Sequence, residues 1–164
     1  MLVDNNSIPP LADSLLIVDD NEKICELLSL RFRRNGYNTT TAADGKKAVD
    51  LLTQQSFDLI LLDIEMPEMR GLEVLRVLRQ SKSPTELPVI VISANHQSAD
   101  IVEALSLGAN DYTTKPVDFP VVLARVKAHL AHKHAEAALR ESEERYALAA
   151  RPEAASSSLR MVQP

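Results

Sequence analysis

The chain has 164 residues, with 18 Lys and Arg against 23 Asp and Glu, which gives a formal net charge of −5. This length predicts one domain with room for a short extension, and the acidic balance argues against direct nucleic-acid binding, which needs clustered positive charge. The single cysteine excludes an intrachain disulfide, and no apolar run approaches the length that spans a bilayer. The first dozen residues lack the pattern of a secretory signal, so we expect a cytoplasmic protein without membrane contact.

Short apolar runs alternate with helical patterns along the chain. Unbroken apolar runs are typical of strands that are covered on both faces. In chain order, the predicted strands are residues 15–18, 37–41, 58–63, 88–93 and 110–114. Apolar residues at helical spacing follow each of them, and these helical patterns begin at Ile24, Ala48, Leu72, Ile101 and Val122. Such alternation predicts a parallel sheet with helices on both faces, joined by right-handed crossovers.

Five polar side chains stand at the carboxyl ends of these strands, namely Asp19, Asp20, Asp63, Ser93 and Lys115. Open parallel sheets bind ligands at this edge, where the strand order reverses. Three neighbouring carboxylates repel one another unless their pKa values rise or a cation neutralises them, and an all-oxygen ligand set favours Mg²⁺. A carboxylate can also form an acyl phosphate, and Asp63 is the best candidate because it ends the central run. For any single acid, a solvated turn residue or helix N-cap is the simpler interpretation.

Four sequence blocks carry a family resemblance. They are residues 16–21 (LIVDDN), 58–71 (DLILLDIEMPEMRG), 88–94 (PVIVISA) and 108–116 (GANDYTTKP). In this order and spacing they make the chain, over residues 13–132, similar to two-component response-regulator receiver domains of the CheY type. The resemblance implies a flavodoxin-like (βα)5 fold, in which a doubly wound parallel sheet has the strand order 2-1-3-4-5.

The resemblance also implies a phosphorelay function. Asp63 would accept a phosphoryl group from a phosphohistidine on a sensor histidine kinase or a histidine phosphotransfer protein. The implied cofactor is Mg²⁺, bound directly by Asp20, largely through water by Asp19, and by Asp63 and the backbone carbonyl of Glu65. The resemblance thus describes a signalling module that assists only its own phosphorylation and dephosphorylation, and not an enzyme.

A second set of residues is implied to sense the phosphoryl group. Lys115, Ser93 and the backbone N–H of Ala94 would contact its oxygens. Ser93 would move towards it and Tyr112 would turn inward, which shifts the population between two packings and changes a protein-interaction face. The resemblance also implies a cis peptide bond between Lys115 and Pro116 that aims the lysine into the crevice.

Three alternative interpretations fit the sequence less well. A scaffold receiver that works without phosphorylation is disfavoured because every site residue is present. An aspartyl-phosphate phosphatase similar to haloacid dehalogenases needs a second Asp two residues after the nucleophile, where this chain has Glu65. A zinc site at His129 and His132 lacks the further ligands that zinc needs, so a solvated helix face is the simpler account of the histidines.

The residues after position 132 predict a helical arm. No Gly or Pro occurs between Ala128 and Ala150, and Leu139 and Tyr146 lie a heptad apart. This pattern is compatible with a short coiled coil that forms a homodimer or with a solvated single helix. Residues 138–150 resemble the helical lead-in to PAS sensor domains, which often precede cyclic-di-GMP enzymes. The chain is therefore expected to be either a fragment of a larger regulator or a stand-alone receiver with a helical arm.

The expected organisation has four parts, of which the last is small and polar. They are a flexible leader over residues 1–12, a receiver domain over 13–132, a helical linker over 133–150 and a disordered tail over 151–164.

Overall fold

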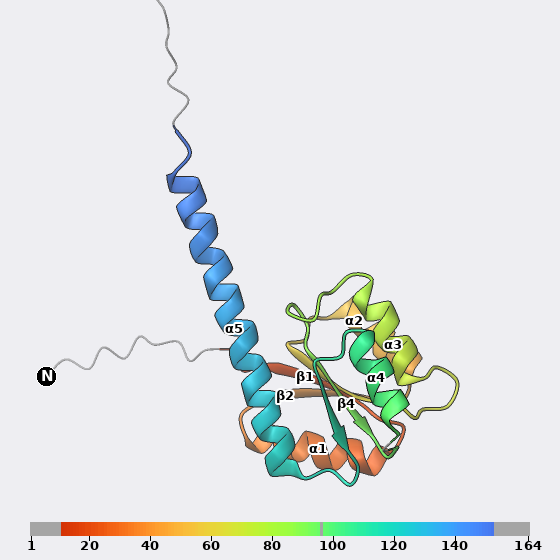
Figure 1. The fold of residues 1–164 in the computed structure, drawn as a ribbon. Coiled ribbons are helices and arrows are strands. Elements are labelled where there is room, and N and C mark those ends of the chain that lie inside the picture. Colours follow the sequence, from red (N-terminus) through yellow and green to blue (C-terminus); the bar gives the residue numbers. More distant parts are fainter. Residues whose placement is uncertain (1–10, 96, 153–164) are drawn as a thin grey trace, which may run out of the picture.

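A computed structural model of the chain describes residues 11–95 and 97–152. Within these residues, five strands alternate with five helices (Figure 1). In chain order they are β1 (Ser14–Val18), α1 (Glu22–Arg34), β2 (Asn38–Ala42), α2 (Gly45–Gln54), β3 (Leu59–Asp63), α3 (Gly71–Arg79), β4 (Val89–Ser93), α4 (Ser98–Ser106), β5 (Asp111–Thr114) and α5 (Phe119–Ala149). Most of the predicted leader and tail, residues 1–10 and 153–164, lies outside the described residues.

The five strands form one parallel sheet in the order β2-β1-β3-β4-β5. This order confirms the predicted flavodoxin-like fold. Val18 at the end of β1 lies opposite Leu62 of β3, and Ser93 at the end of β4 lies opposite Thr114 at the end of β5. The register therefore brings the carboxyl ends of four strands to one edge of the sheet.

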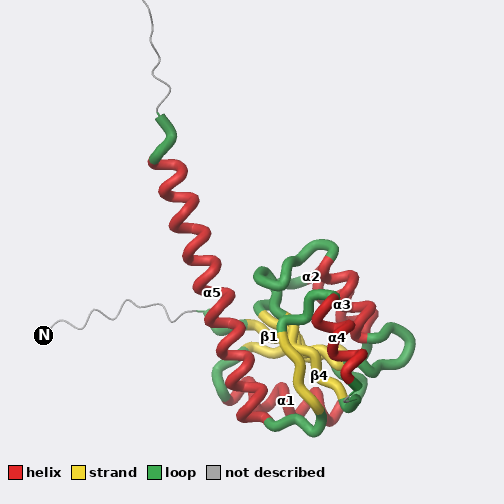
Figure 2. The backbone as a smooth tube through the Cα atoms, viewed as in Figure 1, coloured by secondary structure: helices red, strands yellow, loops and turns green. Residues whose placement is uncertain are grey.

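Helices cover both faces of the sheet and explain the unbroken apolar runs (Figure 2). Leu16 and Val18 of β1 face a core shared with α2, α3 and α4, whereas Leu15 and Ile17 face a core shared with α1 and α5. Successive side chains of a strand point to opposite faces, so a strand between two helical layers needs apolar residues at every position. Each fully buried Leu or Ile contributes about 1.5–3 kcal/mol of transfer free energy.

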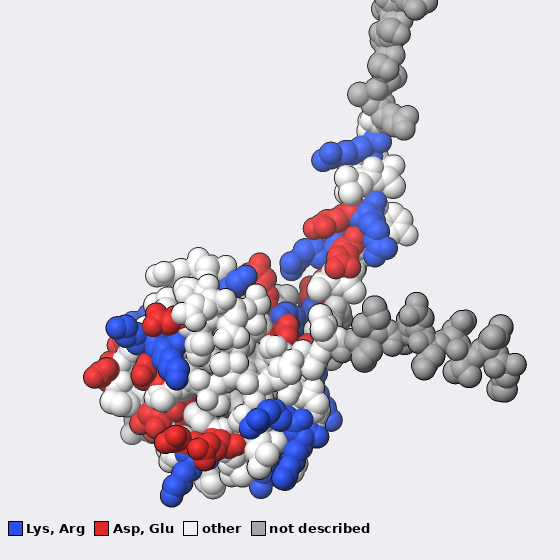
Figure 3. Space-filling view, turned by 180° about the vertical axis from the view of Figure 1, so that it is seen from behind, with Lys and Arg blue, Asp and Glu red and all other residues white. Residues whose placement is uncertain are grey.

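The last helix extends far beyond the body of the domain (Figure 1). α5 has 31 residues, and Val122, Val126 and Leu130 in its first part are buried. Further along, Leu139 is 54% exposed and Tyr146 is 77% exposed. Acidic and basic side chains are interspersed along this arm (Figure 3). Among the described residues, no helix is apolar over a long enough stretch to cross a membrane.

Two ion pairs and one contact between a histidine and a carboxylate hold the base of α5 against the sheet. Arg125 Nη1 lies 2.9 Å from one carboxylate oxygen of Asp111 in β5, and His129 Nε2 lies 2.9 Å from the other. Lys133 Nζ lies 3.1 Å from Oδ1 of Asp58, the residue that precedes β3. His129 is thus half-buried against a carboxylate, whereas the sequence favoured a solvated helix face for it.

Candidate functional site

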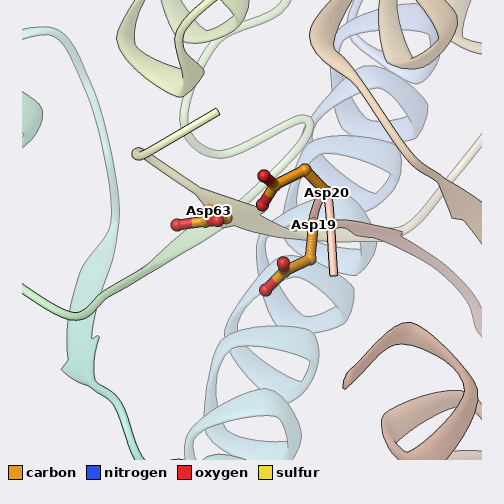
Figure 4. Close-up of side chains that lie close together, drawn as sticks. All are labelled: Asp19, Asp20 and Asp63. Carbon is orange, nitrogen blue, oxygen red and sulfur yellow. The ribbon is translucent and has the colours of Figure 1, made fainter. Parts of the chain in front are cut away.

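Three aspartates meet at the carboxyl edge of the sheet (Figure 4). Asp19 and Asp20 follow the last residue of β1, and Asp63 is the last residue of the neighbouring strand β3. One carboxylate oxygen from each lies within 4.8 Å of the other two. Asp19 and Asp63 are buried, and Asp20 is exposed. The structure therefore brings together the three acids that the sequence placed at strand ends.

Backbone N–H groups and one lysine orient the two buried carboxylates. Asp19 Oδ1 accepts a hydrogen bond from the N–H of Asn21 at 2.8 Å, and Asp63 Oδ1 accepts one from the N–H of Glu65 at 3.1 Å. The other oxygens face Lys115, whose Nζ lies 2.7 Å from Asp19 Oδ2 and 3.3 Å from Asp63 Oδ2. The peptide bond that follows Lys115 is cis. Lys115 thus reaches the acids from the end of β5.

The charge balance of this cluster is negative. Burial, and then the charge of Asp19, raise the pKa of Asp63 to about 6 against the lowering effects of the Glu65 N–H and of Lys115. Burial alone would lower the pKa of Lys115, but the hydrogen bonds and charges of Asp19 and Asp63 outweigh it and raise that pKa. One ammonium therefore faces three carboxylates, two of which are buried.

The donor chemistry fits a hard divalent cation. Asp19, Asp20 and Asp63 offer only oxygen ligands, which suit Mg²⁺ rather than zinc or copper. A cation at this place would offset both the burial and the repulsion by Asp19 that raise the pKa of Asp63. Glu65, to which the resemblance assigns a metal-binding carbonyl, lies beside Asp63 at the start of the following loop.

Glycine lets α3 approach the backbone of the central aspartate. A Cβ added to Gly71 would lie 2.1 Å from the carbonyl oxygen of Asp63. The N–H of Gly71 donates to the carbonyl oxygen of Ile64 at 3.1 Å. No L side chain fits there without displacing the backbone, so Gly71 keeps the loop after Asp63 tightly folded.

Ser93 has partners other than Asp63. Its side chain is fully buried at the end of β4, and its hydroxyl donates to Glu65 Oε1 at 3.3 Å. The same hydroxyl accepts a hydrogen bond from the N–H of Asn95 at 3.0 Å. The intervening residue, Ala94, is exposed. Sequence reasoning missed the Glu65–Ser93 hydrogen bond because it joins side chains 28 positions apart and no motif signals it.

The side chain of Tyr112 in β5 is joined to the loop after β4. Its ring packs, partly buried, against the core shared by α2, α3 and α4. Its hydroxyl donates a hydrogen bond to the carbonyl of Asn95. The side-chain amide of Asn95 donates to Asp100 Oδ2 at the start of α4, at 2.6 Å. Asn95 therefore connects the loop after Ser93 with both β5 and α4.

Comparison with known proteins gives a family and close structural relatives. Residues 15–127 match the family model of the response regulator receiver domain. The uncharacterized transcriptional regulatory protein YkoG of Bacillus subtilis (strain 168) is 42% identical over 116 residues, which are 71% of this chain and 50% of YkoG. The chain thus spans about half the length of this curated relative.

Two solved structures show the same arrangement of elements. A CheY-like response regulator receiver domain protein from Methanospirillum hungatei JF-1 aligns with a TM-score of 0.73 at 27% identity, over 76% of this chain and 98% of that one. The response regulator protein TrrA from Thermotoga maritima, solved in complex with Mg²⁺-BeF, aligns with a TM-score of 0.64 at 31% identity, over 71% of this chain and 98% of that one.

Proposed function

This chain belongs to the response regulator receiver domain family of two-component signalling, and from that premise we propose that it is switched by phosphorylation of Asp63. Receiver domains of this family are signalling modules. The observation that supports the proposal is the placement of Asp63, buried at the end of β3 among two further aspartates and the ammonium of Lys115.

The proposed reaction transfers one phosphoryl group. An ionised oxygen of Asp63 attacks the phosphorus of a phosphohistidine on a histidine kinase or phosphotransfer protein. The P–O bond forms as the P–N bond to the imidazole breaks, and the imidazole nitrogen keeps the electron pair. Lys115 balances negative charge on the transferring oxygens, which is the main need of phosphoryl transfer. Water later hydrolyses the acyl phosphate and returns the carboxylate and inorganic phosphate.

Asp19, Asp20 and Asp63, with the backbone carbonyl of Glu65, are the residues that would hold Mg²⁺. When bound, Mg²⁺ supplies positive charge to the phosphoryl oxygens. Two observations support this assignment. The carboxylate cluster offers only oxygen ligands, and the structure of the relative TrrA was determined in complex with Mg²⁺-BeF.

Ser93, the N–H of Ala94 and Lys115 are proposed to contact the phosphoryl oxygens. If the Ser93 hydroxyl turns to the phosphoryl group, its hydrogen bond with the N–H of Asn95 changes. Asn95 also accepts a hydrogen bond from Tyr112, so the change would reach β5. The switch would then be a shift in population between two arrangements of this loop, β5 and α4. The affected surface is the one that a downstream protein would contact.

The wider setting is also a proposal. We place the receiver domain at residues 13–132 and a helical linker at 133–150, and we assign the chain to the cytoplasm, with no direct contact to nucleic acid or membrane. The arm is proposed to join two copies of the chain. The similarity of residues 138–150 to a PAS lead-in, and the link to cyclic-di-GMP signalling that it suggests, stay predictions.

A phosphoryl donor with a P–N bond tests this function. We expect phosphoramidate to add one phosphoryl group per chain in the presence of Mg²⁺, seen by intact mass, and the adduct to decay with release of inorganic phosphate. Sustained turnover of p-nitrophenyl phosphate would support a phosphatase instead. A folded chain that takes no phosphoryl group would support the scaffold interpretation.

A further inference from the structure

Ser93 has a single hydroxyl proton, and in the structure the hydroxyl uses it to donate a hydrogen bond to Glu65. The Ser93 hydroxyl is fully buried, donates to Glu65 Oε1 at 3.3 Å and accepts from the N–H of Asn95 at 3.0 Å. A serine hydroxyl has one donor and two acceptor sites. Ser93 can therefore donate to Glu65 or to a phosphoryl group on Asp63, and not to both at once.

Glu65 is fixed in a place from which it competes for that proton. Its backbone N–H donates to Asp63 Oδ1 at 3.1 Å, which ties residue 65 to the phosphoacceptor. Its exposed side chain reaches across from the loop after β3 to the end of β4. The acceptor is a carboxylate, and hydrogen bonds to ionised acceptors are stronger than those between neutral groups.

We infer that the Glu65 side chain is a positioning residue that opposes activation by holding the hydroxyl of Ser93. The inference rests on the proposed phosphorylation of Asp63. The side chain of Glu65 acts through Ser93 and not on the reacting atoms. A phosphoryl group can engage Ser93 only after the Glu65–Ser93 hydrogen bond breaks, so the loss of that bond favours the phosphorylated arrangement.

Glu65 also carries a charge. Simple repulsion between this charge and the phosphoryl group would likewise make the loss of Glu65 favour the phosphorylated arrangement. The two explanations differ in their dependence on the acceptor atom and on Ser93. Glu65→Gln removes the charge and keeps a side-chain oxygen that accepts a hydrogen bond, whereas Glu65→Met removes both at similar length. Ser93→Ala removes the group through which the proposed hold acts.

The test measures binding of Mg²⁺ with beryllium fluoride by titration calorimetry, in the full chain and without any covalent step. We expect Glu65→Met to tighten binding about three- to tenfold, the range that one side-chain hydrogen bond at a partly exposed site supplies. Glu65→Gln should change binding by less than about twofold, because the amide oxygen still accepts the Ser93 proton. In the Ser93→Ala background, Glu65→Met should have no effect.

Two results would overturn the inference, and a third would overturn the proposed function on which it rests. Equal tightening by Glu65→Met and Glu65→Gln that persists in Ser93→Ala would assign the effect to charge repulsion. Unchanged binding in Glu65→Met, with normal binding in the wild type, would show that Glu65 does not hold Ser93. Absence of binding in the wild type, confirmed as folded by circular dichroism, would instead contradict the proposed function on which the inference rests.

Discussion

Asp63 is a buried carboxylate whose ionised form the fold itself disfavours. Burial and the neighbouring Asp19 raise its pKa from 3.8 to about 6, although Lys115 and the N–H of Glu65 act in the opposite direction. A raised pKa means that the folded chain holds this proton more tightly than the unfolded chain does. The stability associated with this group is therefore greatest at low pH and falls as the pH rises from about 4 through about 6.

Asp63→Asn is expected to stabilise the metal-free chain at neutral pH. The amide is neutral at every pH, so it avoids the cost of burying the charge, which the pKa shift puts at about 1–3 kcal/mol. Urea unfolding in EDTA at about pH 7.5 and about pH 4 measures the difference in stability between variant and wild type, in which titrating groups that do not contact Asp63 cancel. A difference of the same size at both pH values would contradict this account of Asp63.

Single residues also show what sequence patterns leave undetermined. The sequence placed Asp19, Asp20, Asp63, Ser93 and Lys115 at one edge, because strand ends can be recognised from apolar runs. It did not predict that Lys115 would bridge Asp19 and Asp63, or that Ser93 would donate to Glu65. Such contacts depend on side-chain conformations across neighbouring strands, which periodicity does not specify.

At the scale of elements, the loop between β3 and α3 fixes the site by close backbone packing. A Cβ on Gly71 would lie 2.1 Å from the Asp63 carbonyl oxygen and 2.8 Å from the Ile64 Cα, both of them backbone atoms. The start of α3 therefore presses directly on the residue that the account makes the phosphoacceptor. Any side chain at position 71 must move either α3 or Asp63.

Gly71→Ala is expected to destabilise the chain by about 2–4 kcal/mol, since backbone atoms cannot give way as a flexible side chain does. Gly36→Ala is the matched control: Gly36 has φ +90°, and an added Cβ there meets nothing within 4 Å. Only the conformational cost of about 1–2 kcal/mol applies at that position. Urea unfolding compares the two, and an equal or smaller loss in Gly71→Ala would contradict the close packing described here.

The sequence predicted the positions of the helices and strands better than it predicted the contacts between them. The apolar runs of β1, β3 and β4 were recognisable because both faces of these strands are buried. Arg79 at the end of α3 gave no such signal, yet its guanidinium donates to the carbonyl oxygens of Gly108 and Leu87 and to the side chain of Asn110. Arg79 thus joins the starts of β4 and β5 through neutral acceptors. The sequence did not reveal this contact because charge patterns indicate only pairs of opposite charge.

At the scale of the whole molecule, the arm is a continuous extension of the last helix of the domain. The buried side chains of α5 end near Leu130, and the helix continues without interruption to Ala149. A hydrogen bond between His129 and Asp111 and an ion pair between Lys133 and Asp58 hold its base on the sheet. The sequence predicted the long helix from the absence of Gly and Pro, but not these anchors, which join residues 18 and 75 positions apart.

If the arms pair, the seam runs through Leu139 and Tyr146, which lie a heptad apart and are exposed in the single chain. The double substitution Leu139→Glu with Tyr146→Glu is expected to halve the mass seen by light scattering, because like charges would meet in the seam. Leu148→Glu is the control on the same helix, since Leu148 is 64% exposed and lies off this heptad row. A wild-type chain that is monomeric at high concentration would contradict the pairing of arms.

The central claim is that Asp63 carries the phosphoryl group. The most direct measurement is intact mass after incubation with acetyl phosphate, for the wild type and for Asp63→Asn, with and without Mg²⁺. We expect one phosphoryl group on the wild type with Mg²⁺, and none without Mg²⁺ or on the variant. An adduct of equal size on Asp63→Asn would contradict the claim by placing the phosphoryl group on another residue.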